Sequence, residues 1–154
     1  MTNNDILRRI RYAFDLSDQT MSAIFGLAGY QADREQITGW LKTTDDPAYQ
    51  DLTDKELATF LNGFINYKRG KKEGPQPEPE RRLNNNIVLR KLKIALNLQS
   101  EEIIKIMNLA DMSVSKNELS AFFRSQDHRQ YRECKDQILR NFLKGIQLKY
   151  RAGN

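Results

Sequence analysis

One cysteine and one histidine carry the most obvious potential for covalent chemistry. Cys134 and His128 are the only residues of their kinds in the 154-residue chain. A cysteine nucleophile needs a base that takes its proton, and histidine is the usual base. The six-residue separation does not place the two side chains on one helix face. We therefore expect Cys134 to be a small, semi-buried apolar residue and His128 a surface residue, and we predict that the protein is not an enzyme.

Metal-ligating residues are few or poorly spaced. One cysteine and one histidine cannot build a structural zinc site, which takes four such ligands. Asp45, Asp46, Asp51 and Asp54 lie close together in the sequence. A calcium loop, however, alternates its oxygen ligands and closes with a glutamate. We expect these acids to be loop residues and helix caps, and we predict no metal and no other cofactor.

Basic residues give the strongest chemical signal. The formal charge is +5, and it is unevenly distributed. Residues 1–70 carry eight Lys and Arg against ten Asp and Glu, whereas residues 84–154 carry thirteen against seven. Such asymmetry favours a polyanionic partner, DNA or RNA. The candidate nucleic-acid-binding residues are Lys68, Arg69, Lys71, Lys72, Arg81, Arg82, Arg90, Lys91, Lys93, Lys116, Asn117 and Arg124, and Arg129 and Arg132 cluster with the last of them.

Residues 100–124 have the outline of a helix-turn-helix, with two short helical patterns and a tight connection between them. Lys116 and Arg124 would contact phosphates, and Asn117 would read an adenine edge. The connection lacks the usual glycine, and a helical hairpin in any bundle shows the same pattern. The matching segment of the first half, residues 33–38, includes Asp33 and Glu35, so symmetric binding of two half-sites is not expected.

The elements that must position these residues occur twice in the chain. At an offset of 82, NNDILRRIRYAFDL (3–16) falls on NNIVLRKLKIALNL (85–98), and the match continues without a gap to residue 69. Between the copies, GKKEGPQPEPERR (70–82) holds three closely spaced prolines and two glycines, which indicates an extended linker. The predicted organisation is a first repeat at 1–70, a linker at 71–83 and a second repeat at 84–154.

Each copy is predicted to form four helices. DREQ (33–36), TDKE (53–56) and SKNE (115–118) are capping boxes that open helices. A further helix begins at Ser17 or Asp18, and Ser100 is the expected N-cap of its counterpart. The asparagines that open both copies are interpreted as caps, with one of residues 84–86 capping the first helix of the second copy. The predicted fold is all-α: two tandem four-helix units packed into one compact body about a pseudo-two-fold axis.

Three motifs carry a resemblance to a known family. They are NNDILR at the start of the first copy, LNG (61–63) and PERRLNNN (79–86). With the duplication, they resemble the YehS-like family of small bacterial proteins over essentially the whole chain. The resemblance implies a bacterial, cytoplasmic protein. That family is a domain of unknown function, so it brings no catalytic or ligand residues to this sequence.

The residues together predict a non-enzymatic binding module. The first hypothesis is association with nucleic acid through the basic linker and second repeat. The alternative is a protein-interaction or adaptor role that uses an apolar groove between the repeats. The sequence has no apolar run long enough to span a membrane and no signal peptide, so we expect a cytoplasmic protein without a membrane partner. The oligomeric state is left open.

Overall fold

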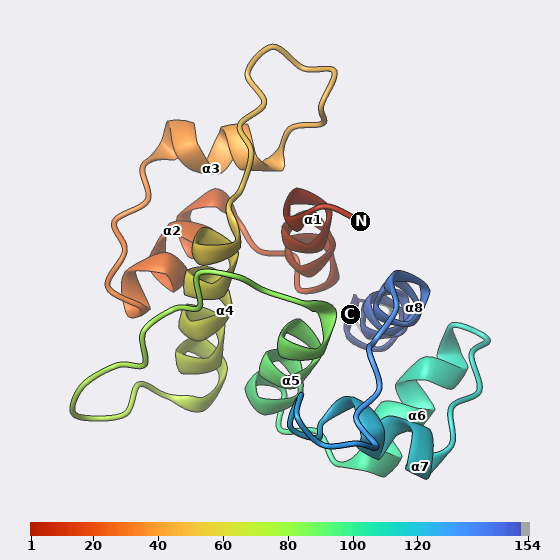
Figure 1. Ribbon diagram of the computed structural model, residues 1–154. Coiled ribbons are helices and arrows are strands. Elements are labelled where there is room, and N and C mark those ends of the chain that lie inside the picture. Colours follow the sequence, from red (N-terminus) through yellow and green to blue (C-terminus); the bar gives the residue numbers. More distant parts are fainter. Residues whose placement is uncertain (152–154) are drawn as a thin grey trace.

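Helices account for all the regular structure in the part of the chain that the computed structural model describes, residues 1–151 (Figure 1). No strand occurs in this range, which confirms the all-α prediction. The last three residues of the predicted second repeat, 152–154, lie outside it. The elements are α1 (Asn3–Ala13), α2 (Asp18–Leu27), α3 (Arg34–Leu41), α4 (Asp54–Arg69), α5 (Asn85–Ala95), α6 (Ser100–Leu109), α7 (Lys116–Phe122), α8 (Asp136–Ile146) and the π-helical turn η1 (Gln147–Arg151).

The predicted capping boxes form at the starts of α3, α4 and α7. In α4, for example, the Glu56 N–H donates to Thr53 Oγ1 (3.1 Å) and the Thr53 N–H donates to Glu56 Oε1 (2.9 Å). Helix α2 begins at Asp18, one of the two predicted starts, and Ser17 is its N-cap. The expected N-cap of α6 is wrong by one residue, because Gln99 holds that position and donates its N–H to Glu102 Oε1 (2.8 Å). These short-range hydrogen bonds fix where each helix begins.

The paired asparagines of the two copies do not cap their helices. Asn84 caps α5, with its side chain accepting from the Ile87 N–H (2.9 Å), and Thr2 holds the matching position of α1. The pairs that follow lie inside the first helical turn. The interpretation of the recurring pair as caps is therefore wrong, although the prediction that one of residues 84–86 caps α5 is confirmed.

The second asparagine of each pair instead anchors a distant loop. Asn86 is buried and donates to the carbonyls of Phe122 (3.0 Å) and Arg132 (2.9 Å), and its oxygen accepts from the Cys134 N–H (2.9 Å). Asn4 makes the same three bonds, to Trp40, Gln50 and Leu52, within 0.1 Å of those lengths. The backbone of this buried loop would otherwise lack hydrogen-bond partners, and the asparagine side chain supplies them. In both repeats the loop before the last helix is thus held in one place.

Glycines allow the second and last helices of each repeat to pack closely. A Cβ on Gly63 would lie 2.0 Å from the Ile24 carbonyl oxygen, and a Cβ on Gly145 would lie 2.1 Å from that of Ile106. No other residue type fits at either crossing, which explains the glycine in the LNG motif. The two crossings are equivalent under the 82-residue offset, so the structure keeps the internal duplication in its helix packing.

The two repeats interlock about the predicted pseudo-two-fold axis. Helix α5 of the second repeat packs along α4 of the first, and α1 of the first packs along α8 and η1 of the second. The starts of the repeats also cross over: the Met1 amino group donates to Asp136 Oδ2 (3.1 Å) and the Leu83 N–H donates to Asp54 Oδ2 (2.9 Å). In Figure 1, α1, α4, α5 and α8 occupy the middle, and α3 and α7 lie toward opposite ends. One apolar core runs through both repeats.

Candidate nucleic-acid interface

The twelve predicted binding residues do not form one surface, and two of them serve internal packing. Lys91 Nζ lies 3.0 Å from Glu80 Oε1 and donates to Asn62 Oδ1 (2.6 Å), with only 12% of its side chain exposed. It thereby joins the linker, α4 and α5. Lys93 Nζ lies 5.3 Å from the centre of the Phe123 ring, a cation–π contact. Both charges already have a partner within the molecule.

Lys68 and Arg69 line a cavity of about 510 Å³ between the repeats, together with Ala95, Leu96, Asn97 and Tyr150. Lys68 Nζ lies 4.7 Å from the centre of the Phe14 ring, and burial lowers the pKa of this amine. The adaptor hypothesis predicted an apolar groove here. Two cations, an asparagine and a tyrosine line this cavity alongside its two apolar residues.

The linker carries four exposed cations. Lys71, Lys72, Arg81 and Arg82 are all solvent-exposed. Gln76 holds the linker against the first repeat, since its side-chain oxygen accepts from Asn66 Nδ2 (2.9 Å). These four residues add positive charge along the green segment between α4 and α5 in Figure 1.

A cleft of about 360 Å³ at the end of the second repeat brings together two predicted residues from separate elements. Arg90 comes from α5 and Arg124 from the connection after α7, and both line this cleft. The rest of its polar wall is formed by Asn84, Asn86, Ser125, Gln126 and Tyr131. The first turn of α5 holds no acidic residue, so the helix dipole adds to the positive potential of the two arginines.

A second cleft, of about 340 Å³, adjoins the first. Asn117, Arg129 and Arg132 line it, and Tyr131 lines both clefts. We call the surface formed by Arg90, Asn117, Arg124, Arg129, Tyr131 and Arg132 the basic face. Tyr131 was not among the predicted site residues.

The arginines of the basic face carry positive charge that no carboxylate neutralises directly. None of the four takes part in an ion pair within residues 1–151. Arg124 donates to the neutral Gln130 side chain (2.9 Å). Glu118 also lines the second cleft, but its carboxylate accepts from the Ser115 N–H (3.2 Å). Hydrogen bonds from Ser115 and, more weakly, the charge of Arg132 hold the pKa of Glu118 below its usual value.

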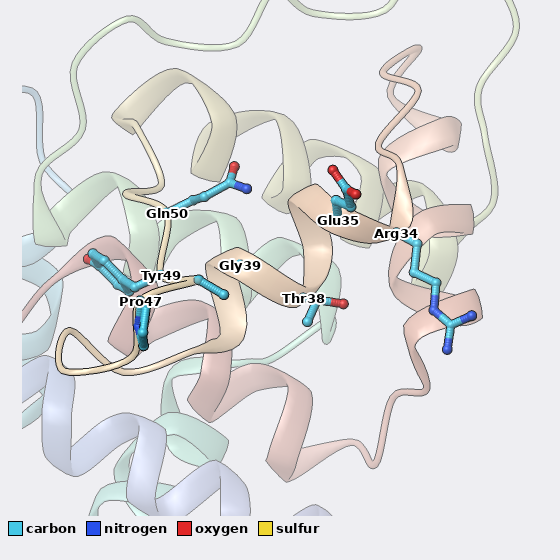
Figure 2. Close-up of a pocket in the computed structure, with 8 residues that line it drawn as sticks. Arg34, Glu35, Thr38, Gly39, Pro47, Tyr49 and Gln50 are labelled. Atoms are coloured by element: carbon cyan, nitrogen blue, oxygen red, sulfur yellow. The ribbon is translucent and has the colours of Figure 1, made fainter.

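The equivalent cleft of the first repeat is larger, about 540 Å³, and carries different charges. Figure 2 shows this cleft, where Glu35, Pro47 and Gln50 stand in place of Asn117, Arg129 and Arg132. In the neighbouring position Asp5 replaces Ile87 and forms an ion pair with Arg8. The arginine that corresponds to Arg90 is therefore neutralised in the first repeat.

Tyr49 and Tyr131 occupy equivalent positions with different partners. The Tyr49 hydroxyl donates to Asp51 Oδ1 (2.7 Å), which raises the pKa of this phenol, and it also contacts Asn4 Oδ1 (3.1 Å). Glu133 replaces Asp51 in the second repeat and pairs with Lys135 instead (3.2 Å). No hydrogen bond of the Tyr131 hydroxyl is found within residues 1–151.

The geometry of α6 and α7 differs from that of the predicted helix-turn-helix. Helices α6 and α7 form, but six residues, 110–115, connect them, whereas a helix-turn-helix uses three or four. Helix α7 has only seven residues, and Lys116 at its start pairs with Glu101 of α6 (3.1 Å). Lys105 of α6 and Lys116 of α7 are exposed, whereas the arginines of the basic face lie on α5 and on the connection that follows α7.

Cys134 and His128 lie in different surroundings. Cys134 is buried, more deeply than expected, and burial raises the pKa of its thiol to about 12. Burial therefore favours the neutral thiol over the thiolate that nucleophilic attack requires. His128 is exposed, as predicted, and its Nδ1 accepts from the Gln130 N–H (3.0 Å).

The acids of this cluster in the first repeat make structural hydrogen bonds; three lie in the loop as predicted, and Asp54 is the first residue of α4 rather than its cap. Asp45 accepts from Thr43, Asp46 from the Ala48 N–H (2.8 Å), Asp51 from Tyr49 and Asp54 from Asn3 (2.7 Å). Over residues 1–151, no three His, Cys, Asp or Glu side chains come together as a metal site would require. In the same range, no helix has the length and apolar character needed to cross a bilayer.

Comparison with known proteins agrees with the duplicated architecture. The family described as "Protein of unknown function (DUF1456)" matches twice, at residues 3–70 and 85–152. The chain belongs to the DUF1456 family. One relative is the "Uncharacterized protein YehS" of Escherichia coli (strain K12), which is 45% identical over 147 residues, covering 95% of this chain and 94% of the relative. The predicted resemblance is confirmed. No solved structure matches the chain.

Proposed function

We propose that this DUF1456 protein binds nucleic acid through the basic face of its second repeat. The observation that carries the proposal is a group of four arginines around two adjoining clefts, none of which pairs with a carboxylate of residues 1–151. Phosphates are the ligands that arginine binds best, through paired and charge-assisted hydrogen bonds. A series of such contacts, rather than one, distinguishes a polyanion from a small anion. The linker cations Lys71, Lys72, Arg81 and Arg82 would extend the contact.

The local charge difference between the repeats supports this proposal. Residues 116–135 hold five Lys and Arg against three Asp and Glu, whereas the equivalent residues 34–53 hold two against four. Half of the charge difference between the two repeats therefore lies in this short segment. A basic surface that served only to keep the protein in solution would have no reason to concentrate at one end.

The adaptor alternative has weaker support. The cavity between the repeats contains Lys68 and Arg69, and these charges suit an anion better than an apolar partner helix. A non-enzymatic role in the cytoplasm, where nucleic acid is accessible, completes the proposal.

Charge reversal on the basic face tests the proposal. Binding of labelled RNA and DNA is measured by fluorescence anisotropy for the wild type and for R90E/R124E. The control, R34E/K55E, changes the net charge equally at exposed positions of the first repeat. We expect R90E/R124E to weaken binding by about tenfold or more, since these cations would neutralise phosphates, and the control by about threefold or less. Absence of binding at about 50 mM salt, or an equal decrease in both variants, would overturn the proposal.

A further inference from the structure

We infer that the basic face takes single-stranded rather than duplex nucleic acid, with a base stacked on Tyr131 and the flanking phosphates in its two clefts. This inference rests on the proposed function and deepens it. Its starting point is the position of Tyr131, the residue that both clefts share. An aromatic ring between two sets of cations is the arrangement that single-strand-binding surfaces use, because every base offers a face for stacking.

The backbone on both sides of Tyr131 is fixed. The Tyr131 N–H donates to the His128 carbonyl (2.9 Å), and the Arg132 N–H donates to the Ala121 carbonyl (3.1 Å). The Arg132 carbonyl accepts from the buried Asn86 side chain (2.9 Å). The ring is therefore presented by a loop that is already ordered, so a base that stacks on it need not order the loop first.

The comparison with Tyr49 shows which changes make the second repeat suited to a nucleotide. Asp51 binds the Tyr49 hydroxyl and places a negative charge beside the ring. Such a charge repels a phosphate. In the second repeat the equivalent Glu133 turns to Lys135, and Arg129 and Arg132 flank the tyrosine. The ring is retained, and the carboxylate that corresponds to Asp51 pairs with a lysine instead of binding the tyrosine hydroxyl.

The shape of the surface disfavours a duplex. The bases of a duplex are stacked on one another, so Tyr131 could reach none of them without unpairing. Duplex readout in the major groove requires a helix or ribbon that projects into the groove. Helix α7 has seven residues, of which Leu119, Ala121 and Phe122 are buried, and does not offer such a projection. A single strand can place its bases and phosphates independently.

Three labelled ligands test this inference at one salt concentration: oligo-dT and oligo-rU of about 12 nucleotides, and a duplex of about 12 base pairs. We expect the wild type to bind one or both single strands at least about fivefold more tightly than the duplex. Replacing Tyr131 with a non-aromatic residue should reduce single-strand affinity by about tenfold, because one base no longer stacks on the protein. The dT and rU arms separate DNA from RNA.

Four variants separate stacking from folding. Tyr131→Phe keeps the ring and should keep the affinity, whereas Tyr131→Leu keeps much of the volume and should lose it. Tyr131→Ala should behave like Tyr131→Leu, and Tyr49→Ala, the equivalent change in the first repeat, should leave binding unchanged. Circular dichroism confirms that each variant is folded.

The outcomes are distinct. Equal wild-type affinity for duplex and single strands, with Tyr131→Leu unchanged, would overturn the stacking inference and leave the proposed function standing. Absence of salt-dependent binding to all three ligands would overturn both. A decrease in Tyr131→Phe equal to that in Tyr131→Leu would overturn the stacking role of the ring.

Discussion

Asn4 and Asn86 make the same three hydrogen bonds in the two repeats, yet the loops that they hold display opposite charges. In the first repeat the loop carries Pro47, Gln50 and Asp51, and its tyrosine donates to a carboxylate. In the second repeat Arg129, Arg132 and Glu133 occupy those positions. The buried framework fixes the position of the loop, whereas its exposed side chains are free to differ. The comparison therefore assigns the asparagines to folding, and the arginines are the residues through which we propose binding.

The largest effect is expected from removing the framework. Asn86→Ala leaves two carbonyls and one N–H without their partner in a buried setting. We expect a decrease of about 3–5 kcal/mol in the free energy of unfolding, measured by urea denaturation, and a similar decrease for Asn4→Ala. Asn84→Ala removes only a cap and should cost about 1 kcal/mol. A decrease below about 1 kcal/mol for Asn86→Ala would contradict the anchoring role.

The glycine crossings come next. Gly145→Ala and Gly63→Ala would place a methyl group about 2 Å from a backbone oxygen, so α8 or α4 must move away. We expect each variant to lose about 2–3 kcal/mol of stability. Gly26→Ala is the matched control, because its added methyl meets nothing within 4 Å and should stabilise α2 by about 0.5–1 kcal/mol. Thermal denaturation that ranks the three variants equally would contradict this account of the packing.

Transplanting the basic face sharpens the comparison further. The triple variant Glu35→Asn, Pro47→Arg and Gln50→Arg gives the first repeat the residues of the second. We expect it to raise nucleic-acid affinity by about threefold to tenfold, since it adds cations that can bind phosphates. The same triple introduced into R90E/R124E should recover part of the affinity that the charge reversal removed. The affinity of each protein is measured by anisotropy titration. If the triple variant raises the affinity of neither the wild type nor R90E/R124E, the proposal that equivalent positions of the two repeats form equivalent binding surfaces is contradicted.

The smallest effect concerns the Tyr49 phenol. Its hydrogen bond to Asp51 raises its pKa in the folded state. The stabilisation from this bond is therefore present below the usual tyrosine pKa of about 10 and is lost as pH rises through the higher folded value. Asp51→Ala should shift the ultraviolet titration of one tyrosine toward lower pH.

The helices were predictable because their signals are local. Capping boxes at Asp33, Thr53 and Ser115 use residues three apart, and the structure contains all three. The asparagine pairs were misread because their partners lie far away in sequence: Asn86 bonds to residues 36, 46 and 48 positions along the chain. A polar residue at a helix start fits a cap and an anchor equally well until the loop is placed.

The candidate site was predictable only in part. The charge asymmetry identified Arg90 and Arg124 as cations of the second repeat, and folding brings them into one cleft. It also selected Lys91, whose partners Glu80 and Asn62 are separated from it by 11 and 29 residues. Tyr131 was missed, although its identity with Tyr49 amid changed neighbours was visible when the copies were aligned. The sequence does not show which neighbours contact each tyrosine. The structure shows that Asp51 binds the Tyr49 hydroxyl, whereas Glu133 pairs with Lys135.

The salt dependence of binding tests the central claim most directly. The logarithm of the association constant for single-stranded nucleic acid is measured against the logarithm of salt concentration for wild type, R90Q/R124Q and R34Q/K55Q. The account predicts a linear fall for the wild type and a slope reduced by about 1 to 2 in R90Q/R124Q, because two phosphate-binding cations are removed, with no change in R34Q/K55Q. Identical slopes for all three proteins would contradict the assignment of the basic face as the binding surface.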